Sequence, residues 1–394
     1  MTKPTHKTLT CDVLIVGGGP AGLATAQTLA PHAKTIVIHQ DREIGKPVRT
    51  SGGTWVEDME ALGVPSHLYQ QIDEILFRSD NREVRQHLER RKCAVLDITG
   101  TYQWLADLAR NAGADIYTDT KFLHTVETDD GFISEIRSRS IDATRIKSRF
   151  IIDASGTPHA VLADLGLVDK PDRVGVGIEH EFEIKSADKN RAALFVGQAV
   201  KSGYGWIFPA PNNHIRIGVG IIQPVSNLSP RDIYNAVVTP EFLESYGLEL
   251  GPPVQVNAGI IPSVPYDPKL VFGNVIRVGD TANFATPTVG EGIRIAIKFG
   301  RILGERLSET LAQGCRSPLV RYELECRKAL KRNYSFGFTA NERIATYDAD
   351  DWDKSLDRLS RLDEDEVVSL VKSEFTLSMM IKAVGKQVRH KLFG

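Results

Sequence analysis

The sequence predicts an α/β protein with a parallel, doubly wound sheet, an inserted antiparallel-sheet unit and a helical C-terminal region. Three features of its 394 residues lead to this prediction. Residues 11–38 read as strand, glycine-rich turn, helix and strand, which is how a parallel sheet with crossover helices begins. Residues 174–265 contain alternating patterns typical of antiparallel strands with one solvated face. From Glu291 onward the pattern is mostly helical.

The first strand ends in a turn with the pattern G-x-G-x-x-G. Gly17 permits the tight turn, Gly19 lets the backbone approach a pyrophosphate, and Gly22 lets the helix pack on the strand. Pro20 and Ala21 begin the helix, whose N-terminus offers free N–H groups and a positive dipole to phosphates. Because the motif follows a strand, opens a helix and precedes a second strand, it predicts a Rossmann-type dinucleotide-binding fold.

The end of the second strand departs from the usual pattern. The acidic residue that normally holds the adenosine ribose hydroxyls is missing, and His39 stands at its position. His39 can itself hydrogen-bond a hydroxyl, Asp41 can reach the ribose instead, or His39 can simply end the strand. The sequence leaves these alternatives open.

A second glycine-rich segment follows a later strand. It contains Gly279 and Asp280, then a loop, and then Val289, Gly290 and Gly292 ahead of a long helix. A carboxylate at Asp280 can accept hydrogen bonds from ribitol hydroxyls. The helix N-terminus can support negative charge on the N1–C2=O edge of a reduced flavin. Two glycine-led helix starts facing one ligand suit extended FAD better than NAD alone, so the sequence predicts FAD as the cofactor.

The chain resembles the geranylgeranyl reductase family, within the para-hydroxybenzoate hydroxylase-like superfamily of flavoproteins. The resemblance is carried by the glycine turn, by E-I-G-K-P-V-R-T-S-G-G at 43–53, by residues 279–301, and by Y-G-W-I-F-P at 204–209. It spans most of the chain up to about residue 305. The resemblance implies that Arg49 contributes to cofactor binding and that residues 204–209 line a substrate cavity near the flavin.

Tyr204, Trp206 and Phe208 alternate, so a strand would place them on one face. Taken alone, the pattern favours an ordinary aromatic core. The resemblance implies instead a catalytic wall that faces the isoalloxazine and an extended apolar substrate. The proton donor is not evident, and Tyr204 or an ordered water are the candidates.

The resemblance implies an FAD-dependent reductase that transfers hydride from flavin N5 to carbon–carbon double bonds of a prenyl or other apolar substrate. No nucleophile–base pair or histidine cluster with metal spacing is present in the sequence. NADPH visiting the flavin transiently, or an electron-transfer protein, would supply electrons, because no second G-x-G-x-x-G is present. One alternative is a flavin-dependent monooxygenase or halogenase, since Trp206 and Pro209 fit W-x-x-P. Another is a non-redox flavoenzyme resembling lycopene cyclases.

We expect a discontinuous FAD-binding domain at residues 10–60, 95–170 and 270–315. The substrate-binding insert would comprise residues 61–94 and 171–269, and residues 316–394 would form the helical C-terminal region. A formal charge of −2 gives no electrostatic reason to expect nucleic acid. Four scattered cysteines and a polar N-terminus predict a cytoplasmic protein without a secretory signal. The basic amphipathic stretch 372–393 is compatible with peripheral membrane contact or with packing on the protein's own domain.

Overall fold

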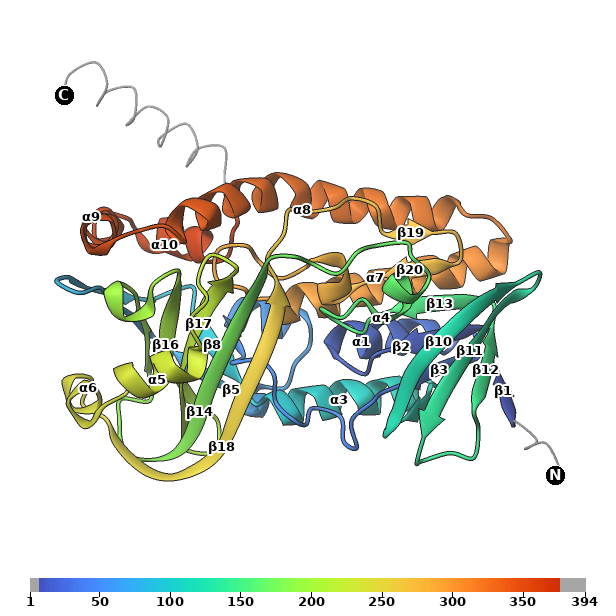
Figure 1. Ribbon diagram of the computed structural model, residues 1–394, viewed down its shortest axis with the longest axis horizontal. Helices are drawn as coiled ribbons and strands as arrows, with labels where there is room; N and C mark the ends of the chain where they lie inside the picture. Colours follow the sequence, from blue (N-terminus) through green and yellow to red (C-terminus); the bar gives the residue numbers. More distant parts are fainter. Residues whose placement is uncertain (1–6, 376–394) are drawn as a thin grey trace, which may run out of the picture.

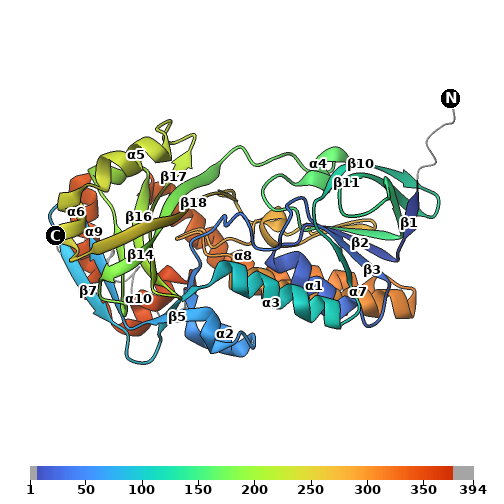
Figure 2. The same cartoon turned by 90° about the horizontal axis from the view of Figure 1, so that it is seen from below.

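The computed structural model describes residues 7–375 of the chain. Figures 1 and 2 show two sheet-containing lobes, with the long helix α8 (Ser317–Ile344) lying along α7 (Ile293–Gln313). The predicted combination of an α/β fold, an antiparallel-sheet unit and a helical C-terminal part is confirmed.

The first lobe is built on a six-stranded sheet with two glycine-led helix starts at its edge. Its strands, in spatial order, are β19 (Val271–Phe272), β20 (Val275–Arg277), β13 (Phe150–Asp153), β2 (Val13–Val16), β3 (Thr35–Ile38) and β9 (Asp115–Tyr117). All neighbours are parallel except β19 and β20. Parallel strands need crossover connections, which is why helices follow them.

This sheet is buried on both faces. Val13 and Ile15 pack toward the layer of α1 (Pro20–Leu29) and α7, with α3 (Ile98–Asn111) against α1. Leu14 and Val16 pack toward the opposite layer, which holds α4 (Ala160–Asp164) and a four-stranded sheet. That sheet has the order β1 (Thr8–Thr10), β12 (Arg145–Ser148), β11 (Gly131–Ser138) and β10 (Thr120–Thr128). Continuous apolar strands follow from burial on both faces.

The second lobe contains a seven-stranded sheet. Its order is β18 (Glu249–Pro262), β14 (Val174–Ser186), β17 (His214–Gln223), β16 (Gly203–Ala210), β15 (Arg191–Phe195), β6 (Glu74–Arg78) and β7 (Glu83–His87). The region expected to be strands also contains two short helices, α5 (Pro230–Val237) and α6 (Pro240–Ser245). Their apolar residues cover one face of the sheet.

A three-stranded sheet joins the lobes, with the order β4 (Gly53–Trp55), β8 (Cys93–Leu96) and β5 (Tyr69–Ile72). Helix α2 (Val56–Ala61) follows β4 directly. Helix α3 begins at Ile98, where the Asp97 side chain accepts a hydrogen bond from Gly100 N–H and caps the helix.

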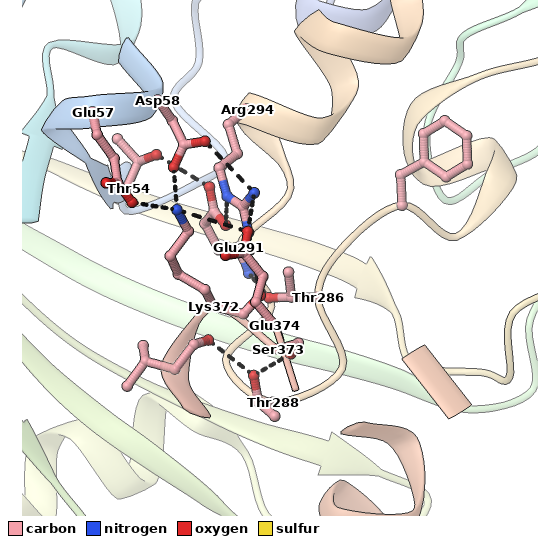
Figure 3. A network of polar contacts seen from close by, with 12 residues as sticks. Thr54, Glu57, Asp58, Thr286, Thr288, Glu291, Arg294, Lys372, Ser373 and Glu374 are labelled. Carbon is pink, nitrogen blue, oxygen red and sulfur yellow. Dashed lines mark hydrogen bonds and ion pairs between the residues drawn. The ribbon is translucent and has the colours of Figure 1, made fainter. Parts of the chain in front are cut away.

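The described part of the C-terminal region is helical and is tied back to the fold. After α8 come α9 (Ala349–Leu359) and α10 (Glu364–Val371). Lys372 is buried, and its Nζ lies 2.7 Å from both Glu57 Oε1 and Asp58 Oδ2 of α2 (Figure 3). Arg294 of α7 joins this network through Glu374, 3.2 Å away. Because the Lys372 and Arg294 side chains are buried, their positive charges must be compensated by the nearby carboxylates. The network therefore anchors the end of α10 to the first lobe.

Burial raises the pKa of Glu57, but the hydrogen bonds and charges of Arg91 and Lys372 outweigh it and hold the pKa at about 2. The ordinary value is 4.5, so this pairing stabilises the fold above that pH and is lost as the pH falls toward 2. We predict that Lys372→Met lowers stability at neutral pH by about 1–3 kcal/mol and weakens this acid dependence. Thermal unfolding followed by circular dichroism from pH 3 to 8 measures both effects. Lys354→Met, at an exposed position of α9, is the control, and equal loss in both variants would contradict the anchor.

Candidate functional site

The first glycine turn has the geometry that its sequence predicts. Gly17 has φ +120°, and a Cβ there would lie 2.1 Å from the Ala154 carbonyl oxygen. A Cβ at Gly22 would lie 2.1 Å from the Gly17 carbonyl oxygen. The helix can therefore pack this closely on the turn only because residue 22 has no side chain. At Gly19, by contrast, no atom lies within 4 Å of such a Cβ. The backbone of Gly19 therefore faces open space at the start of α1, where a phosphate group can approach.

The second glycine segment lies beside the first. Gly279 has φ +74°, and a Cβ there would lie 2.8 Å from Ala21 Cβ of α1. Gly292 precedes the first residue of α7, and its Cβ position is 3.4 Å from Asp280 Oδ1. The two helix starts thus converge, with the Asp280 carboxylate between them.

Asp280 offers a carboxylate that can accept hydrogen bonds from ligand hydroxyls. Within residues 7–375 no donor makes a hydrogen bond to its carboxylate. Burial raises the pKa of this group to about 6. A half-buried carboxylate without a protein partner is costly unless a ligand supplies hydrogen bonds. Together with the open backbone at Gly19, it fits the ribitol and pyrophosphate of FAD.

His39 holds the glycine turn itself. Its Nδ1 accepts a hydrogen bond from Gly18 N–H at 3.3 Å, and its Nε2 lies 3.4 Å from Asp41. Asp41 in turn pairs with Arg49 at 2.7 Å. Burial, reinforced by Arg49 and opposed by Asp41, lowers the pKa of His39. A neutral His39 that accepts at Nδ1 donates from Nε2, so His39, Asp41 and Arg49 form one chain beside the turn.

A cavity of about 460 Å³ lies between the seven-stranded sheet, the helices α8 to α10 and the loop 286–290. This volume is in the range of small-molecule sites. Most of its wall is apolar, including Val176, Ile221, Ile261, Ile344, Leu356, Leu359, Leu362 and Leu370. The loop 286–290 leads directly into Gly292 and α7, so the cavity opens onto the second glycine segment.

Two of the three predicted aromatic residues line this cavity. Tyr204, Trp206 and Phe208 do form a continuous row, with successive ring centroids 5.7 and 6.4 Å apart. Tyr204 and Trp206 belong to the cavity wall, and the Tyr204 hydroxyl donates to the Val289 carbonyl at 2.5 Å. Phe208 lies outside the lining, against Gly53. The row therefore runs from the loop 286–290 to the three-stranded sheet.

Several residues of the wall were not identified from the sequence. Gly177, Gly218 and Gly220 have no side chains where the Trp206 indole lies, and a Cβ at Gly218 would be 2.4 Å from that ring. Glycines inside a strand often mark such a close approach, and the alternation Gly218-Val219-Gly220 was the available signal. Glu179 and Asn257, which join Trp206 in a hydrogen-bonded group, had no comparable signal.

The loop 286–290 is held from three sides. Tyr204 binds it from the sheet. Thr288 Oγ1 donates to the Val371 carbonyl at 3.0 Å and lies 2.6 Å from Ser373 Oγ (Figure 3). At the start of α7 the buried Glu291 accepts from Arg294 at 2.7 Å and from Thr54 at 3.1 Å. The loop 286–290 is therefore held in place by the sheet, the C-terminal region and β4.

This geometry is that of a Rossmann-type dinucleotide-binding fold with an apolar cavity beside the second glycine segment. Residues 10–336 match the family model described as FAD binding domain. The chain therefore belongs to this family of FAD-binding proteins, and FAD is its cofactor.

The relatives agree with the resemblance seen in the sequence. The chain is 26% identical over 398 residues to digeranylgeranylglycerophospholipid reductase 1 of Methanothermobacter thermautotrophicus, covering 95% of this chain and 96% of that protein. It is 24% identical over 369 residues to digeranylgeranylglycerophospholipid reductase of Thermoplasma acidophilum, covering 89% and 92%.

Two solved structures show how widely the fold is shared. A geranylgeranyl bacteriochlorophyll reductase-like protein of Thermoplasma acidophilum has a TM-score of 0.78 at 21% identity, covering 96% of this chain and 100% of that one. A flavin-dependent brominase has a TM-score of 0.69 at 14% identity, with the same coverage. At these identities the structures show the fold alone.

We predict that Asp280→Ala weakens FAD binding about 10- to 100-fold, because hydrogen bonds to a charged acceptor contribute about 1.5–3 kcal/mol. Asp142→Ala, in an exposed position, should leave the Kd unchanged. Equilibrium dialysis or flavin fluorescence titration measures the Kd, and equal affinities for both variants would contradict the assignment.

The raised pKa of Asp280 also predicts a pH effect. The carboxylate form, which accepts ligand hydroxyls, is lost as the pH falls through about 6. The affinity of the wild type for FAD should therefore fall below that pH, whereas Asp280→Asn should show a flatter dependence. Titrations between pH 5 and 8 test this, and parallel curves would argue against a role for the carboxylate.

Proposed function

We propose that this protein is an FAD-dependent reductase that saturates carbon–carbon double bonds of a prenyl or similar apolar chain. The observation that carries the proposal is the cavity of about 460 Å³ whose apolar wall ends at the loop 286–290. A flavin held between Gly19, Asp280 and Gly292 would meet an apolar substrate there. The relatives named as digeranylgeranylglycerophospholipid reductases support this substrate class.

The protein's own residues would bind, orient and enclose the reactants. Reduced FAD supplies the hydride. Gly19 and the start of α1 would hold the pyrophosphate, Asp280 would accept hydrogen bonds from the ribitol hydroxyls, and the N-terminus of α7 would support negative charge on the flavin. The Tyr204 hydroxyl fixes Val289, and therefore the loop, at the cavity end. An isolated alkene is a poor electrophile, so close positioning in a dry cavity must supply much of the rate.

Two alternative reactions, oxygen-dependent halogenation or hydroxylation and non-redox cyclisation, can be distinguished from reduction. Trp206 and Pro209 fit the W-x-x-P pattern of a halogenase, but no lysine lines the cavity within the described residues. The brominase shares the fold at 14% identity, which shows no shared reaction. A non-redox cyclase of the lycopene type would use the same apolar cavity without changing the mass of its substrate.

The reaction is tested by anaerobic incubation of the FAD-loaded protein, reduced with dithionite, with geranylgeranyl lipids. Mass spectrometry should show the gain of two hydrogens per double bond reduced. A product of unchanged mass would support cyclisation. A new hydroxyl or halogen formed with oxygen consumption would support the monooxygenase or halogenase.

The proposed reaction also needs a source of electrons for the flavin. Either NADPH visiting the flavin or an electron-transfer protein would reduce it, and anaerobic flavin bleaching by each donor distinguishes them.

Within residues 7–375 no helix is long and apolar enough to cross a bilayer. Most of the basic stretch 372–393 lies outside the described residues. The outward face of α8 offers a second candidate for lipid contact.

That face combines three apolar side chains that are at least half exposed with four cations that form no ion pair among the described residues. They are Val320, Leu324, Phe336, Arg327, Lys328, Lys331 and Arg332. Such a surface suits anionic lipid headgroups. We predict that the double variant Lys328→Glu and Lys331→Glu loses binding to phosphatidylglycerol vesicles in flotation assays, while FAD binding is retained. Unchanged flotation would exclude α8 as the contact.

A further inference from the structure

Glu179 of β14 is the one acidic side chain in the cavity wall among residues 7–375. It is 2% exposed. Trp206 Nε1–H donates to its Oε2 at 2.8 Å, and Asn257 Nδ2–H donates to its Oε1 at 2.9 Å. Asn257 comes from β18, which pairs with β14, and Trp206 comes from β16, which lies beyond β17 in the sheet. Together they hold the carboxyl in a fixed position at the wall.

Glu179 and Glu181 share one nearby buried cation unevenly. Arg216 of β17 is the buried cation nearby, and its Nε donates to Glu181 at 3.1 Å but lies 3.9 Å from Glu179. His214 and Gln255 also bind Glu181, at 2.8 and 2.9 Å. Glu181 thus takes most of the stabilisation that the cation offers. One buried cation cannot fully compensate two buried carboxylates.

The titration of the two carboxyls follows from this arrangement. Burial raises the pKa of Glu179 more than Arg216, Asn257 and Trp206 lower it, and Glu181 adds to the rise. Burial also acts on Glu181, but there Arg216, Gln255 and His214 prevail and lower its pKa. Behind the sheet, Tyr234 of α5 stacks on His180 and is kept neutral, since burial raises its pKa. Of the two carboxyls, Glu179 is therefore the one whose protonated form is favoured.

We propose that Glu179 is the proton donor to the double bond, an inference that rests on the proposed reductase function. One alkene carbon accepts a hydride from the reduced flavin and the other accepts the Glu179 proton. The π bond breaks, two C–H bonds form, and two electrons pass from the flavin to the substrate. The Glu179 carboxylate regains its proton from solvent before the next turnover.

Other proton donors in the cavity wall are weaker candidates. Within the described residues the wall contains no histidine, cysteine or lysine. The Tyr204 hydroxyl is engaged by Val289, and burial raises its pKa to about 12. Tyr347 also lines the cavity, between α8 and α9, but a phenol is a weaker acid than a carboxyl by about six pKa units.

Glu179→Gln tests the proposal in the FAD-loaded enzyme. The rate of alkene reduction should fall at least 100-fold, the usual contribution of a general acid, while KM and FAD binding change little. The wild-type rate should fall as the pH rises through the pKa of Glu179, and this limb should disappear in the variant. Glu179→Asp should restore part of the rate. Glu183→Gln, exposed on the same strand, should behave as wild type.

A second variant changes the charge balance instead of the donor. Glu181→Gln leaves Arg216 to Glu179 alone, so the alkaline limb of the rate profile should move to lower pH. Infrared difference spectra give a readout that needs no turnover: at a pH below the alkaline limb, the wild type should show a protonated carboxyl band that Glu179→Gln lacks. Reduction by Glu179→Gln with the wild-type rate and pH profile overturns the proposal and leaves the reductase function intact. If the wild type reduces no prenyl substrate, both fail.

Discussion

The close packing of α1 against α7 is the constraint on which the site depends. A Cβ at Gly300 would lie 2.6 Å from the Ala21 carbonyl oxygen, and one at Gly304 would lie 2.5 Å from the Thr25 carbonyl oxygen. These positions exclude any side chain, so the helices approach backbone to backbone. The helices therefore run parallel, and α1 begins beside Gly300, about two turns after the start of α7. Gly279, next to Asp280, contacts the start of α1 at Ala21. The proposed FAD site therefore depends on this helix packing as well as on the two glycine motifs.

The cavity depends on a second close approach, that of an indole to a sheet. Because Gly177, Gly218 and Gly220 lack side chains, Trp206 lies flat on the strands and leaves room above them. The loop 286–290 then closes the space between this wall and the start of α7. The loop 286–290 is therefore the boundary between the apolar cavity and the second glycine segment.

Much of this could be predicted from the sequence because positive φ angles and backbone contacts restrict residue type locally. Gly17, Gly279 and Gly290 all have φ above +70°. The row of alternating aromatics was also predictable, although β16 runs past the cavity and leaves Phe208 outside it. Glu179 was not identified, since it meets Asn257 only through the antiparallel register of β14 with β18. No spacing along the chain encodes that register.

A crystal structure of the protein with bound FAD and a geranylgeranyl chain would show whether the cofactor and the substrate meet at the loop 286–290. We predict the flavin ring at the loop 286–290, the pyrophosphate at Gly19, and the chain along Trp206 with a double bond near Glu179. A chain bound outside the cavity, or a flavin ring that points away from the loop, would contradict this prediction.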